Sequence, residues 1–104
     1  MTIQTTAVSN SATTVYTSTN NTAVTYMQLT NTSAGALTVD IPVIPNGDSL
    51  STTNAVAKTL SISATDSYQL YTGGEKLLLA NGDIVQVTAS AATGINAVVS
   101  FTSI

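Results

Sequence analysis

The chain of 104 residues lacks the side chains that most catalytic and metal sites use. It has no cysteine and no histidine, and because its two basic residues are Lys58 and Lys76, it has no arginine either. Disulfides, thiolate zinc sites, catalytic triads and arginine-assisted phosphoryl transfer are therefore excluded. We predict no catalytic residue, no metal ligand and no cofactor, and we expect that the chain is not an enzyme.

Charge is also scarce, at 7% of residues with a net charge of −3. Nucleic-acid binding is not expected, because it needs clustered lysine or arginine side chains. A soluble protein that acts alone usually carries more charge to keep its copies apart, so the low value favours a protein packed in an assembly. No signal peptide is expected. No membrane span is expected either, because no apolar run approaches the roughly 18 residues that one requires.

Serine and threonine are abundant instead and make up about a third of the chain. They are interleaved with valine, isoleucine, leucine and tyrosine, and threonine suits strands because its branched Cβ fits a pleated surface. Turn signals rich in Gly, Asn, Asp and Pro recur about every 8–12 residues, while no segment keeps a helical period. The pattern predicts an all-β protein, an antiparallel β-sandwich (jelly-roll or Ig-like) of about eight short strands.

The clearest strands are predicted over residues 23–31 and 37–43, where apolar side chains alternate with polar ones. Further strands are expected at residues 13–17, 56–62, 67–71, 76–79, 84–89 and 96–102, with a short one between Ile3 and Val8. Residues 1–22 are weakly patterned overall. We expect them to form an extended or weakly ordered N-terminal arm that precedes a β-sandwich domain over residues 23–104.

Turn signals also predict how the strands connect. Two hairpins are expected, one closed by the turn Asn31–Gly35 and the other by Asn81-Gly82-Asp83 between Leu77 and Ala89. Pro42 has no backbone N–H and is expected at a sheet edge or at the end of its strand. The predicted core consists of Met27, Leu29, Leu37, Val39, Ile41, Leu60, Ile62, Leu70, Leu79, Val85, Val87, Val99 and Phe101.

The five acidic residues are candidates for an acid–base pair or a calcium site. Four of them lie in or beside turns, where an aspartate side chain commonly bonds local backbone N–H groups, so a turn role is favoured over an acid–base pair. Calcium binding is the alternative for the segments Asn46-Gly47-Asp48 and Asn81-Gly82-Asp83, because oxygen-rich loops suit a hard cation. The same sequence is also that of an ordinary turn.

Carbohydrate binding would require exposed aromatic side chains. The candidates are Tyr16, Tyr26, Tyr68 and Tyr71, since the chain has no tryptophan. Tyrosine on a strand usually packs its ring and keeps its hydroxyl in water, so a packing role is favoured. Two glycosylation sequons begin at Asn20 and Asn31, and such sequons arise by chance in a chain this rich in serine and threonine.

Several segments together resemble the small virion proteins of tailed bacteriophages. They are MQLTNTSAGALTVDI (27–41), Leu60-Ser-Ile, Ser67-Tyr-Gln-Leu, NGDIVQVTAS (81–90) and the closing strand from Ala97 to Ser103. Chains of that group combine a strand ending L-x-N-x-S, an alternating strand, an L-x-x-GD-x-I-x-V-x-A-S hairpin and a final strand. The resemblance covers residues 23–104, and Gly82-Asp83-Ile84-Val85 departs slightly from the G-D-x-I spacing of the group.

The resemblance implies a structural role in the virion, assembled in the host bacterial cytoplasm. The first expectation is a capsid decoration or cement protein whose partner is the major capsid protein or another virion protein. Contacts are expected on the N-terminal arm and on the loop of residues 45–55. A homo-oligomer is expected, with a trimer favoured because closed symmetry covers edge strands. A ring or fibre component of the neck or tail is the alternative, and a glycan-binding surface module is a further one.

Overall fold

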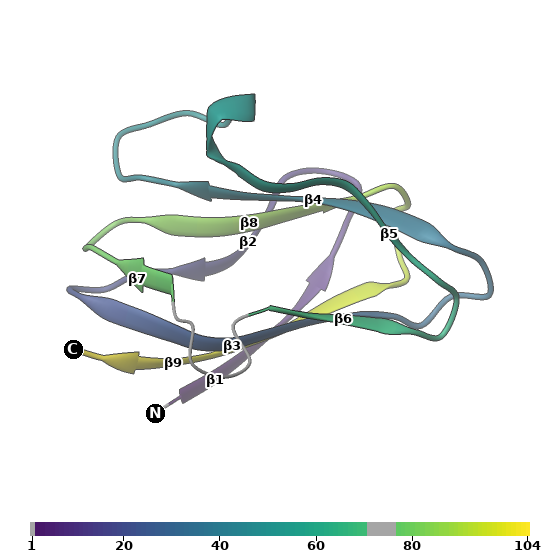
Figure 1. Cartoon of the computed structure of the whole chain (residues 1–104), viewed down its shortest axis with the longest axis horizontal. Helices are drawn as coiled ribbons and strands as arrows, with labels where there is room; N and C mark the ends of the chain where they lie inside the picture. Colours follow the sequence, from purple (N-terminus) through teal and green to yellow (C-terminus); the bar gives the residue numbers. More distant parts are fainter. Residues whose placement is uncertain (1, 71–76) are drawn as a thin grey trace.

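The computed structural model describes residues 2–70 and 77–104, which form nine strands in two packed antiparallel sheets (Figure 1). The first sheet has the order β1 (Thr2–Val8), β9 (Ile95–Ser103), β3 (Thr22–Asn31) and β6 (Ser67–Leu70), with β7 (Leu77–Leu79) also paired to β3. The second sheet has the order β2 (Thr13–Thr17), β8 (Ile84–Ala89), β4 (Leu37–Ile44) and β5 (Ala55–Ile62). A short 3-10 turn, η1 (Thr52–Asn54), precedes β5. The all-β antiparallel sandwich predicted from the sequence is confirmed.

Strands that follow one another in the chain mostly lie in different sheets. The turn Asn31–Gly35 leads from β3 in the first sheet to β4 in the second, and Asn81-Gly82-Asp83 leads from β7 to β8 in the same way. Both expected hairpins are therefore wrong. Among the described residues, the consecutive strands that pair are β4 and β5. Turn signals and alternation could not distinguish these cases, because a crossing between sheets also leaves one face of each strand toward the core.

The first strands of the chain belong to the sandwich. β1 pairs with β9 along all seven of its residues, and β2 pairs with β8. Val8, Val15 and Tyr16 are buried in the core. The sandwich thus includes residues 2–17, which the weak sequence pattern predicts as part of an arm over residues 1–22 that precedes it. β1 was hard to recognise because it is an edge strand, whose inward positions include the polar Gln4 and Thr6 instead of apolar residues.

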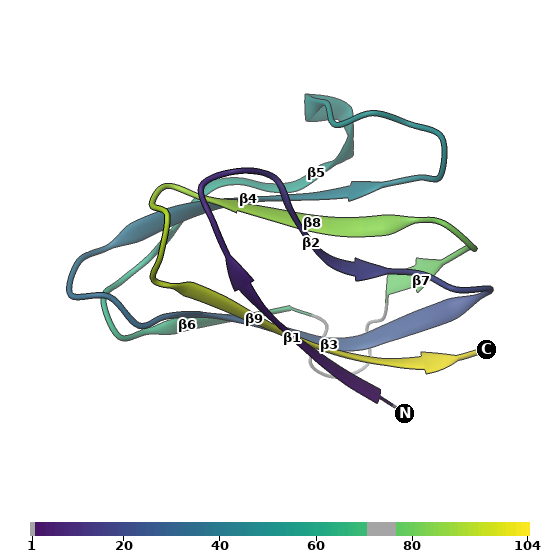
Figure 2. The ribbon, with the colours of Figure 1, turned by 180° about the vertical axis from the view of Figure 1, so that it is seen from behind.

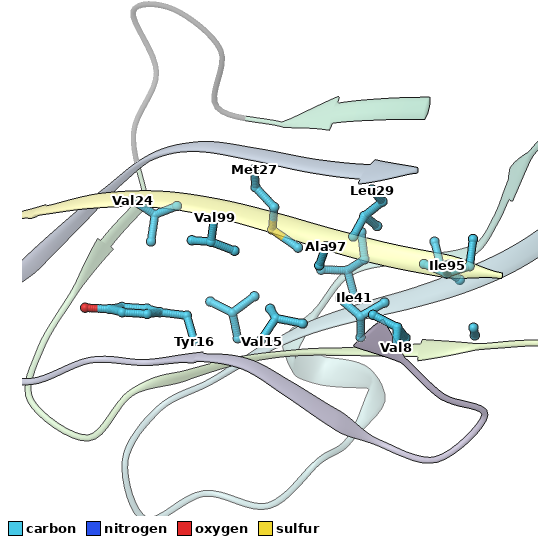
Figure 3. Packing of buried hydrophobic residues seen from close by; sticks show 14 of the residues in the cluster. Val8, Val15, Tyr16, Val24, Met27, Leu29, Ile41, Ile95, Ala97 and Val99 are labelled. Carbon is cyan, nitrogen blue, oxygen red and sulfur yellow. The ribbon is translucent and has the colours of Figure 1, made fainter. Parts of the chain in front are cut away.

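The core lies between the two sheets, whose apolar side chains point toward one another (Figure 3). Nine of the predicted core residues are buried: Met27, Leu29, Val39, Ile41, Ile62, Leu79, Val85, Val87 and Val99. The other four, Leu37, Leu60, Leu70 and Phe101, are partly buried and pack against this cluster. The cluster also contains residues that the prediction did not include: Val8, Val15, Tyr16, Val24, Ala89, Ile95 and Ala97.

Two irregularities explain where the alternation pattern fails. The register between β3 and β9 shifts between Val24 and Tyr26, and this bulge brings Val24 into the core beside Met27. Pro42 lies inside β4, an interior strand, so its expected place at an edge or strand end is wrong. The register between β4 and β5 shifts between Ile41 and Pro42, and a bulge is a position where a sheet tolerates the missing N–H.

Candidate interaction site

A groove of about 190 Å³ lies where the loop between β4 and β5 meets these two strands. Figure 1 shows this loop, with η1 in it, projecting beyond the second sheet. The groove is lined by the apolar residues Pro42, Leu50, Ala55 and Ala57 and by the polar residues Asp40, Ser51, Lys58 and Thr88. The loop of residues 45–55, predicted as a contact region, therefore forms one wall of the groove.

The apolar part of the groove is partly covered by the protein itself. Pro42, which lines the groove, alternates with inward residues of β4 and is nevertheless buried. Leu50 in the loop, which also lines the groove, remains 55% exposed. Large apolar side chains left in water next to a groove are typical of a surface that another molecule covers.

The polar end of the groove is built around Asp40. Its carboxylate accepts a hydrogen bond from the backbone N–H of Thr59 at 2.7 Å and another from Lys58 Nζ at 3.1 Å. Lys58 and Thr59 lie in an irregular stretch of β5, because Val39 pairs with Leu60 whereas Ile41 pairs with Ala57. The Asp40 side chain thus accepts the backbone N–H of Thr59, at a position where the bulge interrupts the regular hydrogen bonds between β4 and β5.

This arrangement fixes the charge state of Asp40. The Thr59 N–H, and after it the Lys58 ammonium, hold the pKa of the carboxyl below its ordinary value despite an opposing effect of burial. Thr59 has φ of 53°, a left-handed conformation that is costly for a β-branched residue, and its bond to Asp40 helps to hold it there. Asp40 is therefore a stable anion paired with a lysine, and not a group ready to exchange a proton near neutral pH.

The two Asn-Gly-Asp segments lie against each other. Asp83 accepts hydrogen bonds from the N–H groups of Asn46 at 2.8 Å and Ala80 at 2.9 Å, one on each carboxylate oxygen. Gly82 has φ of 87°, and a Cβ there would stand 2.6 Å from the Asn46 side chain, so only glycine suits this contact. Both carboxylate oxygens of Asp83 thus accept hydrogen bonds from backbone N–H groups of the two turns. In the described part of the chain, no cluster of three or more acidic residues suited to a metal ion is present.

The tyrosines that could stack on a sugar are dispersed. The Tyr16 ring lies in the core with its centroid 4.2 Å from that of Phe101, and its hydroxyl donates to Thr22 Oγ1 at 3.3 Å. Tyr26 is half-buried and its hydroxyl bonds Gln28. Tyr68 on β6 is 41% exposed, and Tyr71 lies outside the described residues. The described tyrosines therefore form no shared aromatic platform.

Asn31 is a structural residue that the sequence analysis did not recognise. It is fully buried, and its Nδ2 donates to the carbonyls of Gly35 at 2.9 Å and Ile62 at 3.0 Å. Its Oδ1 accepts from the N–H and the hydroxyl of Ser33. This amide is inaccessible in the fold and cannot serve as a glycosylation site there. The usable signal was its place at the start of a turn, where an asparagine side chain bonds the backbone two residues ahead.

Comparison of the chain with protein-family models, with curated proteins and with solved structures finds no match. Among the described residues, no helix has the length and apolar character needed to cross a membrane. The virion role suggested by the sequence patterns therefore stays a prediction.

Proposed function

We propose that this chain is a non-enzymatic structural protein of a tailed-phage virion, which decorates or cements the capsid by binding the major capsid protein and bridging its subunits. The observation that carries the proposal is the groove between the 45–55 loop and the second sheet, whose lining residue Leu50 is exposed to solvent. An apolar protrusion of a capsid subunit would fill this groove.

The energetics of the groove favour a protein partner. Covering apolar side chains contributes roughly 25 cal/mol for each Å² removed from water, so burial of the exposed Leu50 side chain favours association. The Asp40 carboxylate already has two donors, so a partner that covers the groove leaves no unpaired charge behind. With only 7% charged residues, the rest of the surface presents few charges whose desolvation would oppose packing into a lattice.

The first test locates the chain in the particle. Virions of the phage that encodes it should be purified, and the amount of this chain measured against the major capsid protein by quantitative mass spectrometry. A copy number comparable with that of the major capsid protein is expected. A few copies per particle would instead support the neck or tail alternative, and absence from purified virions would end the proposal.

The second test addresses the groove. Leu50→Asp places a charge at its apolar wall and should reduce incorporation of the chain into particles at least about tenfold, because the contact would then bury an unpaired carboxylate. Thr93→Asp, in the exposed turn between β8 and β9 and outside the groove, is the matched control and should be incorporated normally. Equal incorporation of both variants would show that the groove is not the contact.

A further inference from the structure

The edge strands of the two sheets differ in how well they are protected against pairing with another chain. β5 has two register shifts along β4 and carries Lys58. β2 has a bulge between Thr14 and Tyr16 along β8. Bulges and lysines are among the usual devices that prevent edge-to-edge pairing.

β1 has none of these devices. Its seven residues, TIQTTAV, contain no charge and no proline, and they pair with β9 without any register shift. Figure 2 shows β1 on the side of the sandwich that faces the viewer, at the edge of its sheet. Within the described residues, no strand pairs with the other edge of β1. β1 therefore offers a regular row of backbone donors and acceptors to a partner strand.

We propose that two copies of this chain associate through antiparallel pairing of β1 with β1, about a two-fold axis at Thr5. Thr5 is the middle residue of the strand, so this register is the one that pairs all seven residues. Ile3 of each copy then lies opposite Ala7 of the other, on the outer face of the first sheet. The first sheets of the two copies become one continuous sheet across the dimer.

The sequence of β1 is compatible with pairing to itself. A two-fold axis through a residue keeps outward positions opposite outward positions, so the inward face of the strand stays toward the core in both copies. Ile3 is 66% exposed in the single chain and would lose part of that exposure against Ala7. No charged side chain meets its own copy, which is the usual obstacle to self-pairing.

Self-pairing of β1 also decides the symmetry. An isologous contact, in which the same strand is used by both copies, closes with two subunits. A trimer would require β1 to pair with a different edge of the next copy, and the edges β2 and β5 carry the devices described above. The two-fold dimer therefore replaces the trimer expected from the sequence. It does not rest on the virion role, because it concerns the isolated chain.

Light scattering coupled to size-exclusion chromatography tests the contact. The purified chain should elute with twice its monomer mass. Thr5→Lys places two ammonium groups opposite each other at the axis and should raise the dimer dissociation constant about tenfold or more. Ser61→Lys adds the same charge to an exposed position on β5, at the edge of the other sheet, and should leave the dimer intact. Circular dichroism of both variants must match the parent chain.

Cross-linking tests the register, with no native cysteine to interfere. Residues directly opposite in an antiparallel pair have Cα atoms about 4.5–5.5 Å apart, which is within disulfide range. Thr5→Cys should therefore form a disulfide dimer on mild oxidation. Ile3→Cys and Ala7→Cys should cross-link with each other when mixed, but poorly alone, because their own copies lie roughly 14 Å apart.

Each other outcome would overturn the proposal. A monomer at high concentration or a trimer by light scattering rejects the two-fold contact directly. A dimer that withstands Thr5→Lys and fails to cross-link through Thr5→Cys uses another surface. None of these results bears on whether the chain is present in virions, so the two proposals fail separately.

Discussion

The two lateral sides of the sandwich are closed in opposite ways. On the side of β1 and β2, Val8, Val15 and Tyr16 are buried and seal the space between the sheets. On the side of β5 and β6, Leu60 and Leu70 are only partly buried. The core thus reaches the side of β1 and β2 more fully than the side of β5 and β6, where Ile62 is the one buried residue among the described residues of the two strands.

The main chain shows the reverse difference. β1 is regular along its whole length, whereas β5 is interrupted by two register shifts and by the left-handed Thr59. A regular strand keeps every second side chain inward, but its edge can accept another strand. A bulged strand resists pairing with another chain, but the bulge interrupts the regular alternation of inward and outward side chains. The side that packs best is therefore also the side that is open to self-association.

The largest expected effect comes from removing the side chain that closes the β1 and β2 side. Tyr16→Ala leaves a cavity against Phe101 and should lower the free energy of unfolding by about 3–5 kcal/mol. Leu70→Ala on the other side should cost only about 1–2 kcal/mol, because Leu70 is only partly buried. Urea denaturation of both variants measures the difference. Equal losses would remove the distinction between the two sides.

Tyr16→Phe separates packing from hydrogen bonding at the same position. It keeps the ring beside Phe101 and removes only the bond to Thr22, so a loss of about 1 kcal/mol is expected. A loss as large as that of Tyr16→Ala would show that the buried hydroxyl, and not the ring, closes this side.

Each side is also tied across the two sheets by one amide side chain. Asn31 on β3 donates to the Ile62 carbonyl of β5, and Gln4 on β1 donates to the Val15 carbonyl of β2 at 2.8 Å. Asn31→Ala should lower the free energy of unfolding by about 2–4 kcal/mol. It leaves the carbonyls of Gly35 and Ile62 without this donor and removes the bonds to Ser33. Gln4→Ala should cost about 1 kcal/mol, because Gln4 is only partly buried and makes this one bond.

Urea denaturation of Asn31→Ala and Gln4→Ala measures the loss of unfolding free energy on each side. We expect the side of β5 and β6 to depend on Asn31 more than the side of β1 and β2 depends on Gln4, so the ratio of the two losses in unfolding free energy is informative. If Gln4→Ala were as destabilising as Asn31→Ala, the packed side would owe its closure to hydrogen bonding. Asn31→Asp is a useful companion, because it keeps the size of the side chain while removing both Nδ2 donors.

The strands themselves could be predicted from the sequence, and their partners could not. Alternation and turn residues fixed β2 and β8 to the residue, and they placed the central strands to within about one residue. Pairing is a property of distant segments, as in β1 with β9 and β2 with β8. No local pattern carries that information, so the two turns expected to close hairpins proved to cross between the sheets.

The sequence predicts separate parts of the groove but not how they come together. The loop of residues 45–55 was a predicted contact region, and Asp40 was the one acid not assigned to a turn. Their meeting at the groove depends on the bulged register between β4 and β5. A bulge has no reliable sequence signal when its left-handed residue is a threonine, as Thr59 is, and not a glycine.

The smallest expected effect concerns the pH response of the bulged side. Because the folded state holds the pKa of Asp40 below its ordinary value, ionised Asp40 stabilises the fold fully above its unfolded pKa. That stabilisation is lost as the pH falls through the lower folded pKa. Asp40 is 36% exposed, so solvent screening limits the contribution to about 1 kcal/mol or less. Asp40→Asn should therefore unfold with a weaker dependence on acid than the parent chain.

Lys58→Met distinguishes the two partners of Asp40 in the same acid titration of unfolding. It removes the ion pair but leaves the hydrogen bond from the Thr59 N–H, which is the larger cause of the lowered pKa. This variant should keep most of the acid dependence that Asp40→Asn loses. If Lys58→Met flattened the titration as completely as Asp40→Asn, the bulge would be held by charge and not by the backbone bond. The protection of the β5 edge would then weaken at high salt, which screens an exposed ion pair but not a short hydrogen bond.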